Sequence, residues 1–401
     1  MKNFELFTPT KIIFGKGTES QVAKEIIAFN GQKVLIHYGS ESVKKSGLLE
    51  RIKNSLEESK IPYVESGGVV PNPRLSKVKE GIQLCEEENV DFILAVGGGS
   101  VIDSAKAIGY GVYNGGNPWD FFDGKRQIQG CLPIGCVLTI SAAGSEMSNS
   151  CVITNEEGWL KRGCKSDTGR PKFSILNPEL TYTLPEYQVA SGIVDILMHA
   201  IERYFSNETM ELTDRLTAGL IKTVLGNAYT LFISGVLEMD VDKSPSYHHF
   251  AEIMWAGSLA HNGLLGCGTE GGDWAPHKLE HELGGLFDVA HGAGISAVWG
   301  SWARYVYQNN LTRFAQFAVD VMNVSPDDKD LEEIALEGIN ALETFFKNIK
   351  MPTTISQLGI KVTDEQILEM ANKCSQNNTI TIGTIKALHR EDMVAIFTMA
   401  K

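Results

Sequence analysis

The chain has 401 residues, of which 43% are hydrophobic and 21% are charged, as in ordinary soluble globular proteins. This length exceeds the size at which a single hydrophobic core usually keeps growing, so we expect two domains. The formal net charge of −13 gives a surface that repels phosphate backbones and anionic lipid, so we expect neither nucleic acid nor a membrane as partner. A small neutral molecule is the expected substrate.

The cysteines and the first residues bear on the cellular compartment. Seven cysteines are spread singly along the chain, and an odd number fits no closed disulfide framework. We therefore expect reduced thiols and a cytoplasmic protein. The segment MKNFELFTPTK lacks an apolar core, and nowhere do about eighteen apolar residues run together, so neither a signal peptide nor a membrane span is expected.

In the first part of the chain, short apolar runs alternate with amphipathic segments. The pattern predicts strands at 33–39, 61–69, 91–96 and 132–140, and helices at 47–59, 75–90 and 101–111. Strands separated by helices are typical of a parallel sheet that binds ligands at the carboxyl ends of its strands.

The pattern of apolar residues changes near Pro178 and Pro185, and nearly every later segment has the periodicity of a helix. The helix candidates are 190–205, 213–236, 250–265, 278–287, 311–322, 330–349 and 364–374. The fold class predicted is therefore an α/β domain at residues 1–185 followed by an all-helical domain at residues 186–401.

Two loops carry features of a nucleotide site. Gly97-Gly98-Gly99-Ser100 follows a predicted strand and opens a helix, where backbone N–H groups bind a pyrophosphate, although a tight strand-to-helix turn explains the same glycines. Asp103 caps that helix or reaches the ligand. After the next strand, Thr139 and Ser141 place hydroxyls at the same sheet edge, where a solvated turn is the alternative.

The strand at 33–39 bears on the choice of dinucleotide. It ends in Gly39-Ser40 rather than in an acid that would hold a ribose 2′-hydroxyl, which favours NADPH over NADH. Glu41 lies just beyond and could serve as that acid.

Histidines and one aspartate suggest a metal site. Asp195 and His199 lie four residues apart and share one helix face, although a buried Asp–His hydrogen bond alone explains such a pair better. The stretch HKLEHELGGLFDVAH adds three histidines and shifts that balance toward a borderline divalent ion such as Fe²⁺, Zn²⁺, Co²⁺ or Ni²⁺. The glutamate of HKLEH is misplaced for a zinc protease.

Taken together, Asp195-x3-His199, His277-x3-His281-x9-His291-Gly292 and the upstream GGGSVIDSAK resemble the iron-containing (group III) alcohol dehydrogenases, and most closely their NADPH-dependent butanol dehydrogenase and aldehyde reductase branch. The resemblance extends from FTPTKIIFGKGT to the helical end. It implies a dinucleotide-binding domain at 1–185, a metal-binding domain at 186–401 and a homodimer.

The resemblance also implies roles for individual residues. It places the metal ligands at Asp195, His199, His277 and His291. The implied nucleotide contacts are Gly39, Ser40, Gly97, Gly98, Gly99, Ser100, Asp103, Thr139, Ser141, Lys161 and Leu180. The family often has a threonine where this chain has Ala143, which puts one hydroxyl contact in doubt.

The implied activity is hydride transfer between NADP(H) and a short- to medium-chain aldehyde or primary alcohol, with a divalent metal, Fe²⁺ first, polarising the substrate oxygen. His281 either donates the proton or lines the pocket while water donates it, and we hold these two roles equal. Glu202 is expected to support a ligand rather than to bind the metal.

Three other functions compete with this one. A glycerol dehydrogenase or a dehydroquinate synthase-like lyase would share the fold, but a lyase for phosphorylated substrates needs several basic residues, and the metal-site segments offer chiefly Arg203 and Lys278. A metallohydrolase would leave the GGGS loop without a purpose. A metal or nucleotide sensor is the non-enzymatic alternative.

Overall fold

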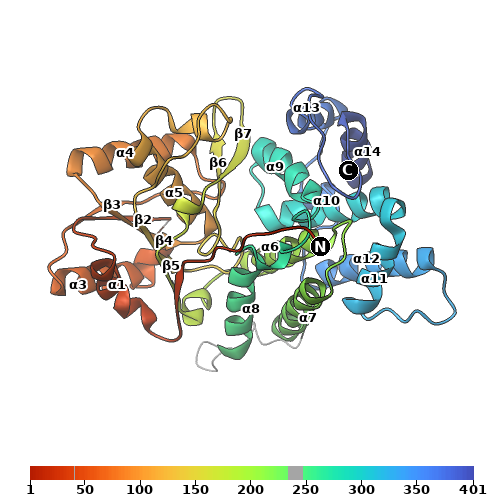
Figure 1. The fold of residues 1–401 in the computed structure, drawn as a ribbon, viewed down its shortest axis with the longest axis horizontal. Coiled ribbons are helices and arrows are strands. Elements are labelled where there is room, and N and C mark those ends of the chain that lie inside the picture. Colours follow the sequence, from red (N-terminus) through yellow and green to blue (C-terminus); the bar gives the residue numbers. More distant parts are fainter. Residues whose placement is uncertain (40, 234–246) are drawn as a thin grey trace. The chain divides into compact units, whose positions relative to one another are not determined.

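The computed structural model describes residues 1–39, 41–233 and 247–401. The chain divides into two compact units, Phe7–Leu184 and Met1–Leu6 with Pro185–Lys401 (Figure 1). The first unit contains the strands and the second is helical, so the predicted fold class is confirmed.

A six-stranded parallel sheet forms the centre of the first unit, in the order β1-β8-β5-β4-β2-β3. Every residue of β2, β4 and β5 is buried, which explains why these strands are continuously apolar. The strands of the sheet are β1 Lys11–Phe14, β2 Val34–Tyr38, β3 Tyr63–Ser66, β4 Phe92–Gly97, β5 Ile134–Leu138 and β8 Phe173–Leu176.

Helices cover both faces of this sheet (Figure 1). The helix α1 (Val22–Ala28) and the helix α3 (Leu48–Glu58) pack against one face, and their apolar residues join those of β2 and β4 in one core cluster. The helices α4 (Leu75–Glu88) and α5 (Gly99–Asn114) lie on the other face. A short helix, α2 (Ser42–Lys45), follows β2.

The register of the sheet brings three strand ends to one edge. Tyr38 at the end of β2 pairs with Val96, and Gly97 at the end of β4 pairs with Leu138. The loops that follow β2, β4 and β5 therefore leave the sheet side by side, in the position where parallel sheets bind ligands.

The predicted strands and helices of this unit are all present, but β1, β8, α1, α2 and an antiparallel hairpin were not predicted from the sequence. The hairpin consists of β6 (Ser150–Asn155) and β7 (Leu160–Lys165). The strands β1 and β8 have four residues each, too few to show a pattern without their neighbours.

The second unit is built from helices around α6 (Glu186–Tyr204), in which every residue from Val189 to Tyr204 is buried. Packed with it are α7 Glu211–Ile233, α8 Tyr247–Ala260, α9 Ala275–Phe287, α10 His291–Val306, α11 Leu311–Asp320, α12 Leu331–Asn348, α13 Asp364–Cys374 and α14 Arg390–Ala400. The helices α10 and α14 were not predicted, and the last residues of the helix predicted at 213–236 lie outside the described part of the chain.

Among the described residues, one helix is long and apolar enough to cross a membrane by length and composition alone. This helix is α7, with a mean hydropathy of 1.3 over its most apolar window. Its inner face carries Asp214, which binds Arg313 of α11 at 2.6 Å within the helical unit. A single helix of this kind is weak evidence for a membrane span.

Candidate metal site and dinucleotide-binding loops

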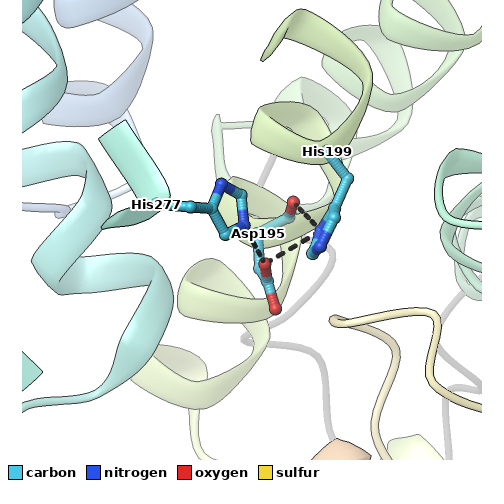
Figure 2. Close-up of side chains that lie close together, drawn as sticks. All are labelled: Asp195, His199 and His277. Carbon is cyan, nitrogen blue, oxygen red and sulfur yellow. Dashed lines mark hydrogen bonds and ion pairs between the residues drawn. The ribbon is translucent and has the colours of Figure 1, made fainter. Parts of the chain in front are cut away.

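The central helix α6 carries the first two candidate ligands. Asp195 and His199 are both only 3% exposed and lie one turn apart. The Nδ1 atom of His199 lies 2.9 Å from the backbone oxygen of Asp195 and 3.0 Å from its Oδ1 atom (Figure 2). The four-residue spacing thus brings the carboxylate and the imidazole together, as the helix period requires.

Two further histidines approach the same carboxylate oxygen from other helices. The Nε2 atom of His277, from α9, lies 3.7 Å from Asp195 Oδ1 (Figure 2), and the Nε2 atom of His291, the first residue of α10, lies at the same distance. Asp195, His199 and His277 each offer a ligand atom within 4.8 Å of the others. All four residues expected to bind a metal are therefore gathered around one oxygen atom.

Each of these histidines has its Nδ1 atom beside an acceptor. His277 Nδ1 lies 2.6 Å from Glu202 Oε1, and His291 Nδ1 is hydrogen-bonded to Glu280 Oε2. For His199 the acceptor is the Asp195 carbonyl. An acceptor at Nδ1 keeps the proton there and leaves the lone pair on Nε2, which is how metal-binding histidines are usually oriented.

The pKa values reflect the burial of this cluster. Burial lowers the pKa of His199 to about 4, so this imidazole is neutral and able to bind a cation at neutral pH. Burial raises the pKa of Glu202 to about 7. Burial lowers the pKa of His277, but the Glu202 and Asp195 carboxylates outweigh burial and raise this pKa to about 9. A cation that binds His277 Nε2 would therefore have to displace a proton from this imidazole.

Two buried atoms at the centre of the cluster have close polar neighbours but no hydrogen bond of good geometry among the described residues. They are Asp195 Oδ1 and His277 Nε2, one carboxylate oxygen and one imidazole nitrogen that face each other. Leaving such groups unpaired in the interior costs free energy, and a cation bound between them would remove that cost. One carboxylate and three imidazoles suit a borderline divalent ion, so these residues fit the expected metal.

His281 lies on α9 one turn after His277, at the edge of this cluster. It is partly exposed, its ring centroid is 5.9 Å from that of His291, and Glu280, His281 and His291 offer ligand atoms within 4.8 Å of one another. The structure therefore places the candidate proton donor beside a candidate ligand, with access to solvent.

Three residues of this site were not predicted from the sequence. Glu280 holds His291, and the rings of His261 and Trp274 flank His199, with centroids 4.0 Å and 5.9 Å away. These contacts depend on the packing of neighbouring helices, although a glutamate between two histidines in the sequence was a usable signal for Glu280.

In the first unit, the glycine triplet lies against the loop after β5. A Cβ atom on Gly98 would come within 2.0 Å of Ile140 Cγ2, and one on Gly99 within 2.9 Å of Ala143 Cβ. Thr139 N also donates to Gly97 O at 3.1 Å. Only glycine fits this close approach, at the start of the sixteen-residue helix α5, where the first backbone N–H groups of a helix have no partner within it.

Asp103 and Lys106, in the first turns of α5, form hydrogen bonds that hold the loop after Ser141 in place. Asp103 accepts hydrogen bonds from Ser145 Oγ and from Val152 N, the latter at 2.9 Å. The fully buried Lys106 ammonium donates to Ser145 O and Ser150 O, both at 2.8 Å. These contacts give Asp103 a role in shaping the loop.

The remaining expected nucleotide contacts are more scattered. A Cβ atom on Gly39 would lie 3.6 Å from Val101 Cγ2 in the first turn of α5, so Gly39 adjoins the glycine triplet. Lys161 is buried on β7, and Leu180 packs against the core cluster. Ser40 lies outside the described residues.

Comparison with known proteins identifies the family. Residues 9–178 match the family model described as iron-containing alcohol dehydrogenase, and residues 189–401 match the C-terminal model of the same family. NADH-dependent butanol dehydrogenase A of Clostridium acetobutylicum is 37% identical over 99% of each chain. NADPH-dependent aldehyde reductase YqhD of Escherichia coli is 34% identical over 90% of each chain.

A solved structure supports the same assignment. The crystal structure of NADH-dependent butanol dehydrogenase A from Thermotoga maritima has a TM-score of 0.93 and 38% identity, covering 100% of this chain and 99% of that one. The family models together span most of the sequence. The chain therefore belongs to the iron-containing alcohol dehydrogenase family and is an oxidoreductase.

Proposed function

We propose that this protein interconverts short- to medium-chain aldehydes and primary alcohols by hydride transfer with a nicotinamide dinucleotide, in the manner of a butanol dehydrogenase. The observation that carries the proposal is the convergence of Asp195, His199, His277 and His291 on one carboxylate oxygen. The names of similar proteins, butanol dehydrogenases and an aldehyde reductase, support the substrate class.

The four converging residues are proposed to hold one divalent cation, Fe²⁺ first, with Zn²⁺, Co²⁺ and Ni²⁺ suited to the same donors. When bound, this cation supplies Lewis-acid polarisation of the substrate oxygen. Glu202 and Glu280 keep the protons of His277 and His291 on Nδ1, so that both imidazoles present Nε2 to the cation.

The loops at the sheet edge are proposed to hold the dinucleotide. Backbone N–H groups of Gly97–Ser100 and the start of α5 bind the pyrophosphate, and the hydroxyls of Thr139 and Ser141 contact the rest of the nucleotide. The nicotinamide ring supplies or accepts the hydride. Gly39, Ser40, Asp103, Lys161 and Leu180 complete the proposed set.

The loop after β2 is proposed to decide between NADP(H) and NAD(H). Lys44 Nζ binds Glu41 Oε1 at 2.9 Å, and this contact offsets the charge of the acid that follows β2, which supports the prediction of NADP(H). The names of several relatives at 36–38% identity point to NADH instead. The ratio of kcat/KM for the two dinucleotides decides the question, and a ratio in favour of NADH would reject the NADP(H) prediction.

His281 is proposed to donate the proton that the alcohol oxygen acquires. Its place one turn beyond His277 and its partial exposure let it exchange protons with solvent between turnovers. In the alternative role, His281 lines the pocket and water delivers the proton.

The arrangement of basic residues disfavours a lyase for phosphorylated substrates. Arg203 donates to the His199 carbonyl at 2.8 Å and stacks on the Trp274 ring at 4.5 Å, so its guanidinium is engaged inside the helical unit. A hydrolase would leave the close-packed glycine loop unexplained.

The test is anaerobic purification with elemental analysis, followed by oxidation of NADPH and NADH with butanal before and after chelation. We expect one bound divalent ion per chain and butanal-dependent oxidation that chelation abolishes. A metal-loaded protein that oxidises neither dinucleotide with butanal would overturn the proposed function.

A cytoplasmic homodimer is proposed as the working form. The outer face of α7 exposes Leu212, Leu216, Tyr229 and Ile233, which supports burial against a second copy. Light scattering after gel filtration tests this assembly, and the mass of a single chain would refute it.

A further inference from the structure

Two cysteines face each other across the β6–β7 hairpin of the α/β unit. Cys151 on β6 pairs directly with Cys164 on β7. Directly paired residues of antiparallel strands project their side chains from the same face, next to each other. The register therefore makes the two thiols neighbours on one face of the hairpin.

The pairing type matches the backbone spacing of a disulfide. Ser166 N donates to Asn149 O at 3.0 Å, which makes that pair a hydrogen-bonded one. Such pairs alternate along an antiparallel ladder, so Cys151 and Cys164, two residues further in, form a hydrogen-bonded pair as well. Pairs of this type have Cα atoms about 5.5 Å apart, within the range of about 4.4–6.8 Å found for disulfides. Their Cβ atoms lie toward the wider end of about 4.5–5.5 Å, so the two strands must move slightly closer to reach the Cβ spacing of about 3.5–4.5 Å that a disulfide needs.

The two thiols differ in accessibility. Cys151 is fully buried, and its Sγ atom lies 3.1 Å from the Asp103 carbonyl. Burial raises the pKa of Cys151 well above its usual value, so this thiol does not start a reaction at neutral pH. Cys164 is half-buried and is the more exposed of the two residues.

We propose that Cys151 and Cys164 form a modification site, a dithiol that a small disulfide oxidant converts reversibly into a cross-strand disulfide. The Cys164 sulfur attacks the oxidant, whose S–S bond breaks, and a mixed disulfide forms while one thiol leaves with the Cys164 proton. The Cys151 sulfur then attacks Cys164, the second thiol leaves with the Cys151 proton, and the protein disulfide remains. Two thiols are oxidised and one oxidant disulfide is reduced.

A third cysteine nearby provides a control. Cys131 is half-buried, with its Sγ atom 3.9 Å from the Lys106 carbonyl. Within the described residues, the groups able to hold a metal contain no cysteine, so a dithiol describes this cluster better than a metal site.

The experiment treats the folded, metal-loaded protein with oxidised mercaptoethanol, alkylates the remaining thiols and maps the peptides without reduction. We expect a single new link between Cys151 and Cys164, reversed by dithiothreitol. Cys131→Ser should form the same link, and Cys164→Ser should form none. Cys151→Ser should accumulate the mixed disulfide on Cys164, because the second attack is missing.

Three outcomes would overturn the proposal. The first is a wild-type protein that stops at the mixed disulfide on Cys164, which shows that Cys151 does not attack. The second is a link from Cys164 to Cys131 or to another chain. The third is a protein of unchanged circular dichroism in which both thiols remain open to alkylation after denaturation.

Discussion

Replacing Glu202 with glutamine tests whether the acceptors at Nδ1 support a metal site. Glu202 is fully buried, and its Oε1 atom lies 2.6 Å from His277 Nδ1. Glutamine has nearly the same shape and still offers an oxygen to that N–H group. The change Glu202→Gln therefore removes the charge and keeps the hydrogen bond.

The expected size of the effect follows from that one change. A hydrogen bond to a charged group is worth about 1.5–3 kcal/mol, and a neutral one about 0.5–1.5 kcal/mol. The difference of about 1–1.5 kcal/mol corresponds to metal binding that is about 5- to 13-fold weaker. This range lies at the low end of the about 10- to 100-fold loss typical of residues that orient metal ligands.

The assay is anaerobic competition for Co²⁺ between the protein and a coloured chelator. The matched control is Glu25→Gln, because Glu25 is equally buried but binds Lys11 at 2.8 Å in the other unit. We expect the control to bind Co²⁺ like the wild type. An unchanged dissociation constant in Glu202→Gln, or an equal loss in the control, would refute the reasoning.

Three further changes test other parts of the account. His281→Ala should lower kcat about 100-fold with metal content unchanged, since general acid catalysis contributes at least that much, and a parallel loss of metal by elemental analysis would make His281 a ligand instead. Gly98→Ala should weaken dinucleotide binding in fluorescence titrations, because its Cβ would meet Ile140 Cγ2 at 2.0 Å, whereas Gly226→Ala, with nothing within 4 Å, should bind normally and unfold at a higher temperature. Burial, assisted by the charge of Lys77, lowers the pKa of His37 from 6.5 to about 3 in the folded protein. Below pH 6.5 the imidazole of the unfolded chain is protonated while that of the folded chain stays neutral, so the free energy of unfolding falls as the pH drops below 6.5. His37→Gln should therefore remove about 2 kcal/mol of the loss in unfolding free energy between pH 7.5 and pH 5, measured by urea denaturation, and an unchanged pH dependence would contradict this.

The sequence predicted those parts of the fold that have a pattern of their own. The strands β2, β4 and β5 are continuous apolar runs between amphipathic helices. This pattern predicted both the strands themselves and their arrangement in a parallel sheet. The helix α10 escaped prediction because most of its residues are buried, which leaves no polar face to mark a period. The strands β1 and β8 were too short to recognise alone.

For the candidate site, spacing predicted the pairing within a helix, and the family resemblance supplied the rest. Asp195 and His199 meet because they are four residues apart on α6. Glu202 on α6 reaches His277, and Glu280 on α9 reaches His291, only through the packing of α6, α9 and α10, which no local pattern encodes. The hydrogen bonds by which Asp103 holds the loop after β5 likewise join residues that are far apart in the sequence.

The most direct test of the central claim is the anomalous difference density at the iron edge, from crystals of anaerobically purified protein. We predict one peak at about 2.0–2.2 Å from an Asp195 oxygen, from a ring nitrogen of His199 and from the Nε2 atoms of His277 and His291. A peak that is bound by His281 in place of one of these residues, or that lies away from Asp195, would contradict the account.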